Sequence, residues 1–177
     1  MSDFEKQLEI SFEDKIFMKD KGGKVDLVSY TIEQVRKDPR CAIYVGCDSI
    51  NRRDFTVYYV VVAFRYGARI SLDHRYPSGK GVHYIWKRYK VPRVRDMWTR
   101  LWNEMMYSLK FSKMIEDQTA IKIDSIDLDF NEDEYAGSNA LVSACKGTLT
   151  GYGFKVNVKP EIQVAAKAAD HLCNKKA

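Results

Sequence analysis

The most constraining feature of this sequence is the run from Phe55 to Phe64, FTVYYVVVAF, which is almost entirely aromatic or β-branched. Such residues favour β-strands. Because polar residues do not alternate with the apolar ones, the run predicts a strand that is buried on both faces. A strand of this kind needs a covering layer on each side of its sheet, so the chain is expected to have an α/β fold.

The remaining hydrophobic pattern predicts four further strands and four helices. The strands are expected at Cys41–Ser49, Gly81–Lys90, Ala120–Phe130 and Phe154–Val158, and the helices at Val25–Lys37, Arg93–Ile115, Ser138–Thr150 and Glu161–Asn174. The order predicts a mixed five-stranded sheet, three antiparallel strands and then two parallel ones, flanked by helices. We expect residues 1–24 to be a loose or edge-packed extension and residues 25–177 to form one domain.

The longest predicted helix, Arg93–Ile115, carries an apolar stripe that defines its buried face. The stripe consists of Val94, Met97, Trp98, Leu101, Trp102, Met105 and Leu109. Glu104 lies at the edge of this stripe, about 20° from Met97 at 100° per residue. The Glu104 carboxylate is therefore expected either to face the seam between helix and sheet or to reach out to solvent.

Composition indicates a water-soluble protein with reduced cysteines. No apolar run approaches the roughly 20 residues that span a bilayer, and the first residues lack the apolar region of a signal peptide. The four cysteines are scattered, and neither they nor the three histidines show metal-ligand spacing. We expect a cytoplasmic location.

Other carboxylates stand at places where strands end or helices pack closely. Asp48 closes the apolar strand Cys41–Ser49, where it either caps the following turn or holds a ligand. Asp127 and Asp129 share one face at the end of the fourth strand. Asp170 flanks a face of the last helix that is rich in alanine, which allows close packing.

These carboxylates are expected to converge. If the first and fourth strands are parallel neighbours, Asp48 and Asp129 emerge at the same edge of the sheet, where Glu104 and Asp170 can approach from packed helices. Four converging carboxylates would repel one another and raise their own pKa values unless divalent cations lay between them. Oxygen ligands without His or Cys favour Mg²⁺ or Mn²⁺.

The ordered motifs resemble the ribonuclease H-like fold and, within it, the YkuK-type family. The matching stretches are Asp38-Pro39-Arg40, Val45-Gly46-Cys47-Asp48-Ser49, Gly79-Lys80-Gly81, Ile126-Asp127-Leu128-Asp129, Gly151-Tyr152-Gly153-Phe154, Val158-Lys159-Pro160 and Ala168-Ala169-Asp170. Together they cover roughly residues 25 to 175. The chain departs from the family pattern at Cys47, where Thr is common, in a longer segment from Tyr66 to Ser78, and in its N-terminal extension.

The resemblance implies a nuclease that hydrolyses phosphodiester bonds with two metal ions. Asp48 would bridge the metals, Glu104 and Asp129 would each hold one, and Asp170 would complete the second. Asp127 is the rival to Asp129, and the family motif favours Asp129.

A basic and aromatic segment predicts a nucleic-acid partner, whether DNA, RNA or a hybrid. Between Arg65 and Arg100 ten lysines and arginines face two aspartates, a local charge of +8, which leaves the rest of the chain at −3 within the total of +5. Cations would meet phosphates and an indole would stack on bases. The residues expected to bind are Trp86, Lys87, Arg88, Lys90 and Arg93.

Three other interpretations compete with these expectations. The chain could be a nucleic-acid-binding module without catalytic activity, or the basic segment could be an ordinary edge strand protected from aggregation by its lysines. An actin-like ATPase is disfavoured, because Ser49 to Arg53 contains no glycine and the chain has no phosphate-binding loop of the GxxxxGK[ST] type.

Overall fold

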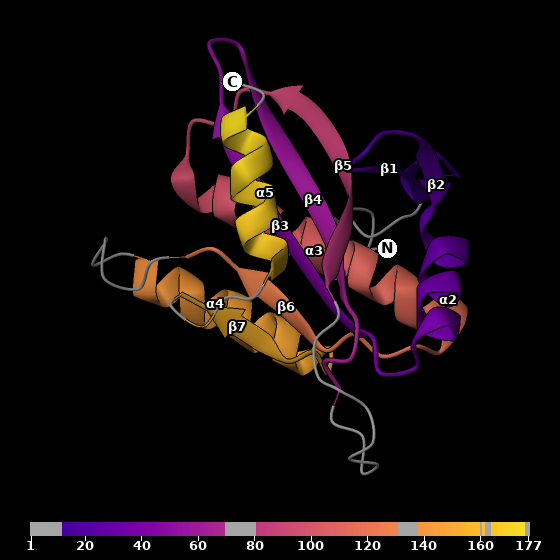
Figure 1. Ribbon diagram of the computed structural model, residues 1–177. Coiled ribbons are helices and arrows are strands. Elements are labelled where there is room, and N and C mark those ends of the chain that lie inside the picture. The colour runs from indigo at the N-terminus through magenta and orange to yellow at the C-terminus, as the bar shows by residue number, and fades with distance from the viewer. Residues whose placement is uncertain (1–11, 70–80, 131–137, 160, 162–163, 176–177) are drawn as a thin grey trace.

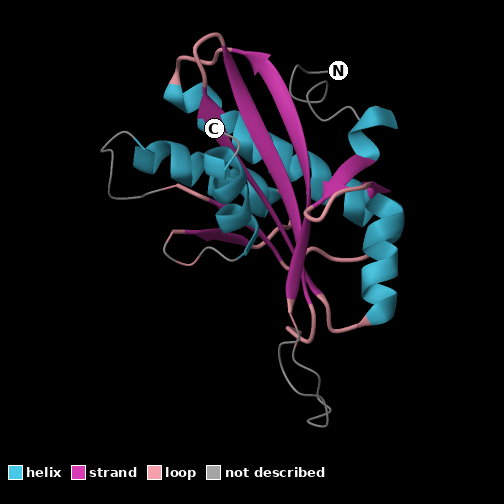
Figure 2. Cartoon of the chain, turned by 45° about the horizontal axis from the view of Figure 1, so that its top comes forward, coloured by secondary structure: helices cyan, strands magenta, loops and turns pink. Residues whose placement is uncertain are grey.

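The protein is a mixed β-sheet covered by helices on both faces (Figures 1 and 2). The computed structural model describes residues 12–69, 81–130, 138–159, 161 and 164–175. The strands are β1 (Ile16–Lys19), β2 (Lys24–Asp26), β3 (Ala42–Asn51), β4 (Phe55–Arg65), β5 (Val82–Pro92), β6 (Ser125–Leu128) and β7 (Val156–Val158). The α-helices are α2 (Leu27–Lys37), α3 (Met97–Thr119), α4 (Ser138–Gly151) and α5 (Val164–Lys175), and a 3₁₀ turn, η1, spans Phe12–Lys15.

The strand order is β2-β1-β5-β4-β3-β6-β7. The strands β3, β4 and β5 form an antiparallel meander, whereas β6 pairs parallel to β3 and β7 pairs parallel to β6. The α/β class and the arrangement of three antiparallel and two parallel strands are therefore confirmed. The parallel pairs follow from the helices that connect their strands, since such a crossover returns the chain to the same end of the sheet.

The predicted number of five strands is wrong, because the described sheet has seven. The two additional strands, β1 and β2, form a hairpin that pairs with the outer side of β5. Phe17 of β1 is fully buried and meets Phe111 of α3 edge to face, with ring centroids 5.1 Å apart. The described part of the expected extension thus belongs to the sheet, and the proposed domain division stays a prediction.

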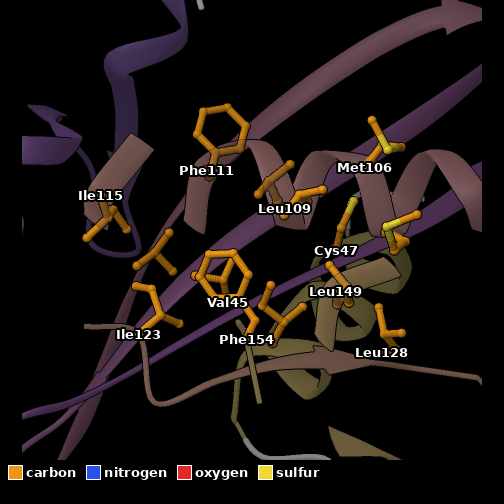
Figure 3. Close-up of a cluster of buried hydrophobic side chains, with 14 of the residues drawn as sticks. Val45, Cys47, Met106, Leu109, Phe111, Ile115, Ile123, Leu128, Leu149 and Phe154 are labelled. Carbon is orange, nitrogen blue, oxygen red and sulfur yellow. The ribbon is translucent and has the colours of Figure 1, made fainter. Parts of the chain in front are cut away.

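Each face of the sheet has its own apolar cluster. The helices α2, α3 and α4 cover one face, where Val45 and Cys47 of β3 meet Leu109 of α3 and Leu149 of α4 (Figure 3). The helix α5 covers the other face with small residues, which pack on alternate side chains of β4. The strand β4 is buried on both faces, as its apolar run predicted.

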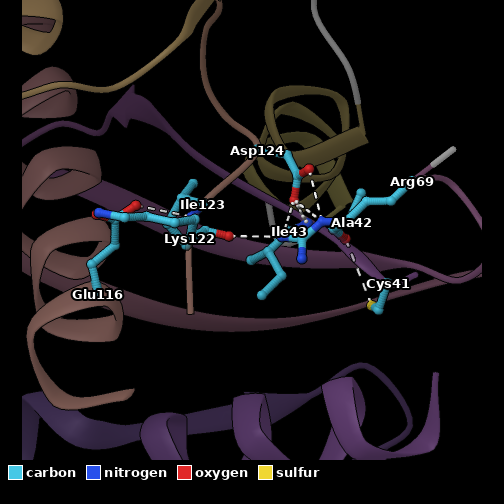
Figure 4. A network of polar contacts seen from close by, with 8 residues as sticks. All are labelled: Cys41, Ala42, Ile43, Arg69, Glu116, Lys122, Ile123 and Asp124. Atoms are coloured by element: carbon cyan, nitrogen blue, oxygen red, sulfur yellow. Dashed lines mark hydrogen bonds and ion pairs between the residues drawn. The ribbon is translucent and has the colours of Figure 1, made fainter. Parts of the chain in front are cut away.

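A network of polar contacts fixes the register between β3 and β6 (Figure 4). Asp124, immediately before β6, accepts a hydrogen bond from Ile43 N at 2.8 Å, and its own backbone N–H donates to Ile43 O. Arg69 forms an ion pair with the same carboxylate, with Nη2 2.7 Å from Oδ2. These contacts align Tyr44 with Ser125 and Cys47 with Leu128.

The long helix begins later than predicted, and Trp98 of the predicted apolar stripe is not part of the core. It starts at Met97, where the Asp96 carboxylate accepts a hydrogen bond from Thr99 N, and so Val94 lies outside it. Trp98, placed in the apolar stripe by its spacing, is 43% exposed. Periodicity identified Met105 and Leu109 as core residues, but it could not show that Trp98 in the first turn is exposed.

Gly46 allows α5 to approach β3 closely. A Cβ atom at this position would lie 2.9 Å from Ala166 N and 3.1 Å from the carbonyl carbon of Ala165, both backbone atoms of α5. Since backbone atoms of a packed helix cannot move aside like the end of a flexible side chain, only glycine fits here.

We expect Gly46→Ala to lower the free energy of unfolding by about 1 to 3 kcal/mol, because α5 must shift to make room. Gly147→Ala in α4 is the matched control, since its Cβ would meet no atom within 4 Å. The control should instead stabilise the protein by about 0.5 to 1 kcal/mol. Urea denaturation followed by circular dichroism measures both, and equal effects would contradict the close approach.

Candidate functional site

The candidate site lies where β3 extends past its neighbour β6. The strand β3 continues to Asn51, but its parallel pairing with β6 ends at Cys47 and Leu128. Asp48 follows Cys47 and Asp129 follows Leu128, so the two aspartates leave the paired region side by side. Beyond this point β6 no longer covers the edge of β3, and helices from both faces of the sheet can contribute to one site.

Asp48 is held by a backbone amide and a thiol. Its Oδ1 accepts a hydrogen bond from Ser49 N at 2.8 Å, and the Cys173 thiol of α5 also donates to the carboxylate. Burial raises the pKa of Asp48 to about 6, and the charges of Asp129 and Asp170 add to this rise, while the two hydrogen bonds oppose it. The carboxylate thus lies in an environment that disfavours its own charge.

Glu104 reaches the site from α3, on the opposite face of the sheet. It is only 2% exposed, and its Oε1 accepts a hydrogen bond from Ser49 Oγ at 2.5 Å. Its Oε2 is buried and has no hydrogen-bond partner among the described residues. Burial raises the pKa of Glu104 well above its usual value, with a further rise from the charge of Asp48, while Arg100 one turn earlier opposes it. The Glu104 carboxylate therefore faces the seam between helix and sheet, which is the first of its two expected positions, and does not reach solvent.

The other two candidate carboxylates have partners of their own. Asp129 forms an ion pair with Lys159, with Nζ 2.5 Å from Oδ1. Asp170, on the exposed side of α5, accepts a hydrogen bond from Asn174 at 2.9 Å. Both nevertheless lie near enough to Asp48 for their charges to raise its pKa.

Asp127, the rival to Asp129, lies inside the sheet. It is fully buried, and its Oδ1 accepts hydrogen bonds from Asn157 Nδ2 at 3.1 Å and Ser125 Oγ at 3.2 Å. These contacts favour a structural role for Asp127.

The four candidate carboxylates interact through their charges without forming a finished metal site. Within the part of the chain that the structure describes, no group of three or more His, Cys, Asp or Glu side chains is arranged to hold a metal ion. The donor chemistry nevertheless fits a hard divalent cation, because the candidates offer only oxygen atoms and one of these, Glu104 Oε2, is buried without a hydrogen-bond partner in the described part of the chain.

The five predicted nucleic-acid-binding residues do not share one surface. Lys87 faces the α3 side of β5, where its Nζ donates to Ile16 O at 3.2 Å. The side chains of Trp86, Arg88 and Lys90 point to the other face, the one covered by α5, because strand residues alternate. Arg93 follows the strand and donates from Nη1 to Arg53 O at 2.8 Å.

The sequence pattern did not indicate three residues of the site as functional candidates: Ser49, Lys159 and Cys173. The place of Lys159 beside Asp129 could have been predicted from the sequence. Lys159 directly follows the last strand, just as Asp129 directly follows the neighbouring parallel strand. The contact of Cys173 with Asp48 depends on how α5 crosses β3, which no local pattern specifies.

The strand order, the helix on each face and the carboxylates beside the end of β6 define an α/β protein of the ribonuclease H-like class. A family model described as Ribonuclease H-like matches residues 26–174, and the chain belongs to this YkuK-type family. No curated protein and no solved structure matches the chain. None of the helices in the described ranges is long and apolar enough to cross a membrane.

We expect Asp48→Asn to remove a pH-dependent loss of stability. Because the pKa of Asp48 is about 6 in the folded protein against a usual 3.8, the folded state holds more protons between these values. The free energy of unfolding of the wild type therefore falls as the pH rises from about 4 to about 6. At pH 7.5 the variant should be more stable than the wild type by on the order of 2 kcal/mol, and at pH 4 about equally stable.

Urea titrations in EDTA across this pH range measure the difference. Asp54→Asn, an exposed change in the turn between β3 and β4, serves as the control and should leave the pH profile unaltered. A difference between Asp48→Asn and wild type that stays constant with pH would show that Asp48 acts only as a turn cap.

Proposed function

We propose that this protein is a nuclease that depends on divalent cations and hydrolyses phosphodiester bonds at the site around Asp48. The observation that carries this proposal is the buried Glu104 carboxylate, whose Oε2 has no partner among the described residues and which lies within electrostatic reach of Asp48 and Asp129. An unpaired carboxylate oxygen in the interior is unfavourable unless a cation or a proton reaches it. The family membership supports a nuclease-like protein.

Asp48, Glu104, Asp129 and Asp170 would hold Mg²⁺ or Mn²⁺. When bound, such cations would activate a water molecule and stabilise the leaving oxygen of a phosphodiester. Ser49 orients two of these carboxylates before a cation binds. Its hydroxyl donates to Glu104, and its backbone N–H donates to Asp48.

The face of the sheet covered by α5 is the proposed side of nucleic-acid approach. Across the antiparallel meander, Asp48 of β3 pairs with Tyr59 of β4, and Tyr59 pairs with Arg88 of β5. Directly paired residues project from the same face, so Arg88 and Asp48 share a face two strands, about 10 Å, apart. The helix α5 packs on β3 and β4 on this face of the sheet (Figure 1). A phosphate backbone bound at Arg88 and Lys90 would lead across α5 toward the carboxylates.

Trp86 is half-buried on this face, where its ring meets Tyr59 with centroids 5.9 Å apart. Its indole packs on the apolar cluster beneath α5. We propose that the remaining exposed part stacks on an unpaired base.

A binding module without catalysis is the second candidate. The observation that favours it is the ion pair between Asp129 and Lys159, since a carboxylate held by an ammonium group is not poised as a metal ligand. The two candidates differ in one outcome, which is cleavage in the presence of a divalent cation.

The test of nuclease activity uses purified protein with Mg²⁺ or Mn²⁺ and labelled single-stranded, duplex, hybrid and branched substrates. We expect cleavage of at least one substrate, its loss in EDTA, and a loss of at least about 100-fold in Asp129→Asn, because a metal ligand is removed. Metal-free binding should hold or tighten in this variant, since a negative charge facing the phosphates is gone. Asp54→Asn should cleave as the wild type does. Binding without cleavage of any substrate would support the module instead.

A second prediction concerns the two faces of β5. Replacing Arg88 and Lys90 together by Gln should weaken binding about equally for all sequences and flatten the dependence of log K on log salt by roughly two units. Lys87→Gln is the matched control, because this lysine faces the α3 side and should change binding little. Fluorescence anisotropy at several salt concentrations measures both. Equal effects of the two changes would contradict the proposed side of approach.

A further inference from the structure

The ion pair between Lys159 and Asp129 is imposed by the sheet. Val158 of β7 is the register partner of Leu128 of β6, and the two strands are parallel. Lys159 follows Val158 and Asp129 follows Leu128, so the two side chains leave adjacent parallel strands at the same level. The ammonium group lies 2.5 Å from Asp129 Oδ1, and the Asp129 side chain is only 11% exposed.

This ammonium group lies where the charge balance of the site requires a cation. Asp48 and Asp129 follow paired residues of the parallel strands β3 and β6, and Glu104 reaches the same region from α3 through its hydrogen bond with Ser49, so three carboxylates lie in one part of the fold. Glu104 is 2% exposed and its Oε2 has no partner among the described residues, so this oxygen is available to a cation. Lys159 offsets part of the negative charge at Asp129.

Among the described residues, this ion pair also occupies one of the oxygen atoms that Asp129 would offer to a metal ion. A carboxylate whose Oδ1 contacts an ammonium group does not offer that oxygen to a metal ion. Within these residues no three carboxylates, thiols or imidazoles are grouped to hold a metal. To offer Oδ1 to a metal ion, Asp129 has to exchange the ammonium group for that cation.

We propose that Lys159 is an internal counter-ion that competes with the divalent cation for Asp129. In the metal-free protein it holds Asp129 and lowers the repulsion within the site, and a divalent cation reaches Oδ1 of Asp129 only by displacing it. This inference rests on the proposed function, because it concerns the same site. Its consequence is regulatory: Lys159 raises the concentration of divalent cation at which the site fills.

Titration calorimetry with Mn²⁺ tests the competition directly, without any nucleic acid. Lys159→Gln should bind Mn²⁺ about threefold to tenfold more tightly than the wild type, as expected for removal of one partly exposed ion pair. Lys155→Gln is the matched control, because this exposed lysine stands at the opposite end of β7. The control should bind as the wild type does.

A double-mutant cycle shows whether the effect passes through Asp129. In the background of Asp129→Asn, the additional change Lys159→Gln should alter Mn²⁺ affinity by less than twofold, because the carboxylate for which the two cations compete is gone. The melting temperature in EDTA supplies a second readout. It should fall in Lys159→Gln, which loses its counter-ion, whereas the rise on adding Mn²⁺ should be larger than in the wild type.

The outcomes separate this inference from the function on which it rests. If wild type and Lys159→Gln bind Mn²⁺ equally well, or the variant binds more weakly, the competition is refuted while a metal-dependent function stands. If neither protein binds Mn²⁺ and neither melting temperature responds to it, the metal-dependent function itself is refuted, and the competition with it. Lys159→Arg, which keeps the positive charge, should retain an affinity near that of the wild type.

Discussion

The parallel pairing of β3 with β6 is the constraint on which the rest of the structure depends. Asp124 fixes this register through Ile43 and Arg69, at the end of the strands remote from the site. Because side chains alternate along a strand, a shift of one residue would turn Asp127 toward the other face and displace Asp129 from Asp48. Asp124, which is not a proposed metal ligand, thus positions Asp48 and Asp129, which are.

The site combines this rigid frame with electrostatic strain. Burial and mutual repulsion raise the pKa of Asp48 and of Glu104, and a chain selected for stability alone would not keep such groups together. The structure moderates the strain locally, through hydrogen bonds from Ser49 and Cys173 and through the ammonium group of Lys159. We propose that a site built in this way favours a divalent cation while the protein remains folded without one.

The proposed nucleic-acid surface follows from the same sheet. The row from Asp48 through Tyr59 to Arg88 joins the acidic site to the basic strand on one face. Lys87, next to Arg88 in sequence, belongs to the other face and contacts the backbone of β1. The distribution of charge along the chain identified the basic segment. Because side chains alternate along a strand, however, its residues divide between the face beside α5 and the face beside α3.

The sequence by itself determined the α/β class, the meander followed by two parallel strands, and the order in which the carboxylates occur, because local periodicity and turn residues encode burial along each element. It did not reveal β1 and β2, whose three or four partly exposed residues give no periodic signal. Nor did it reveal the exposure of Trp98, the burial of Asp127 or the pairing of Lys159 with Asp129. Tertiary structure decided these, because each depends on where one element ends relative to a neighbour that is distant in the chain.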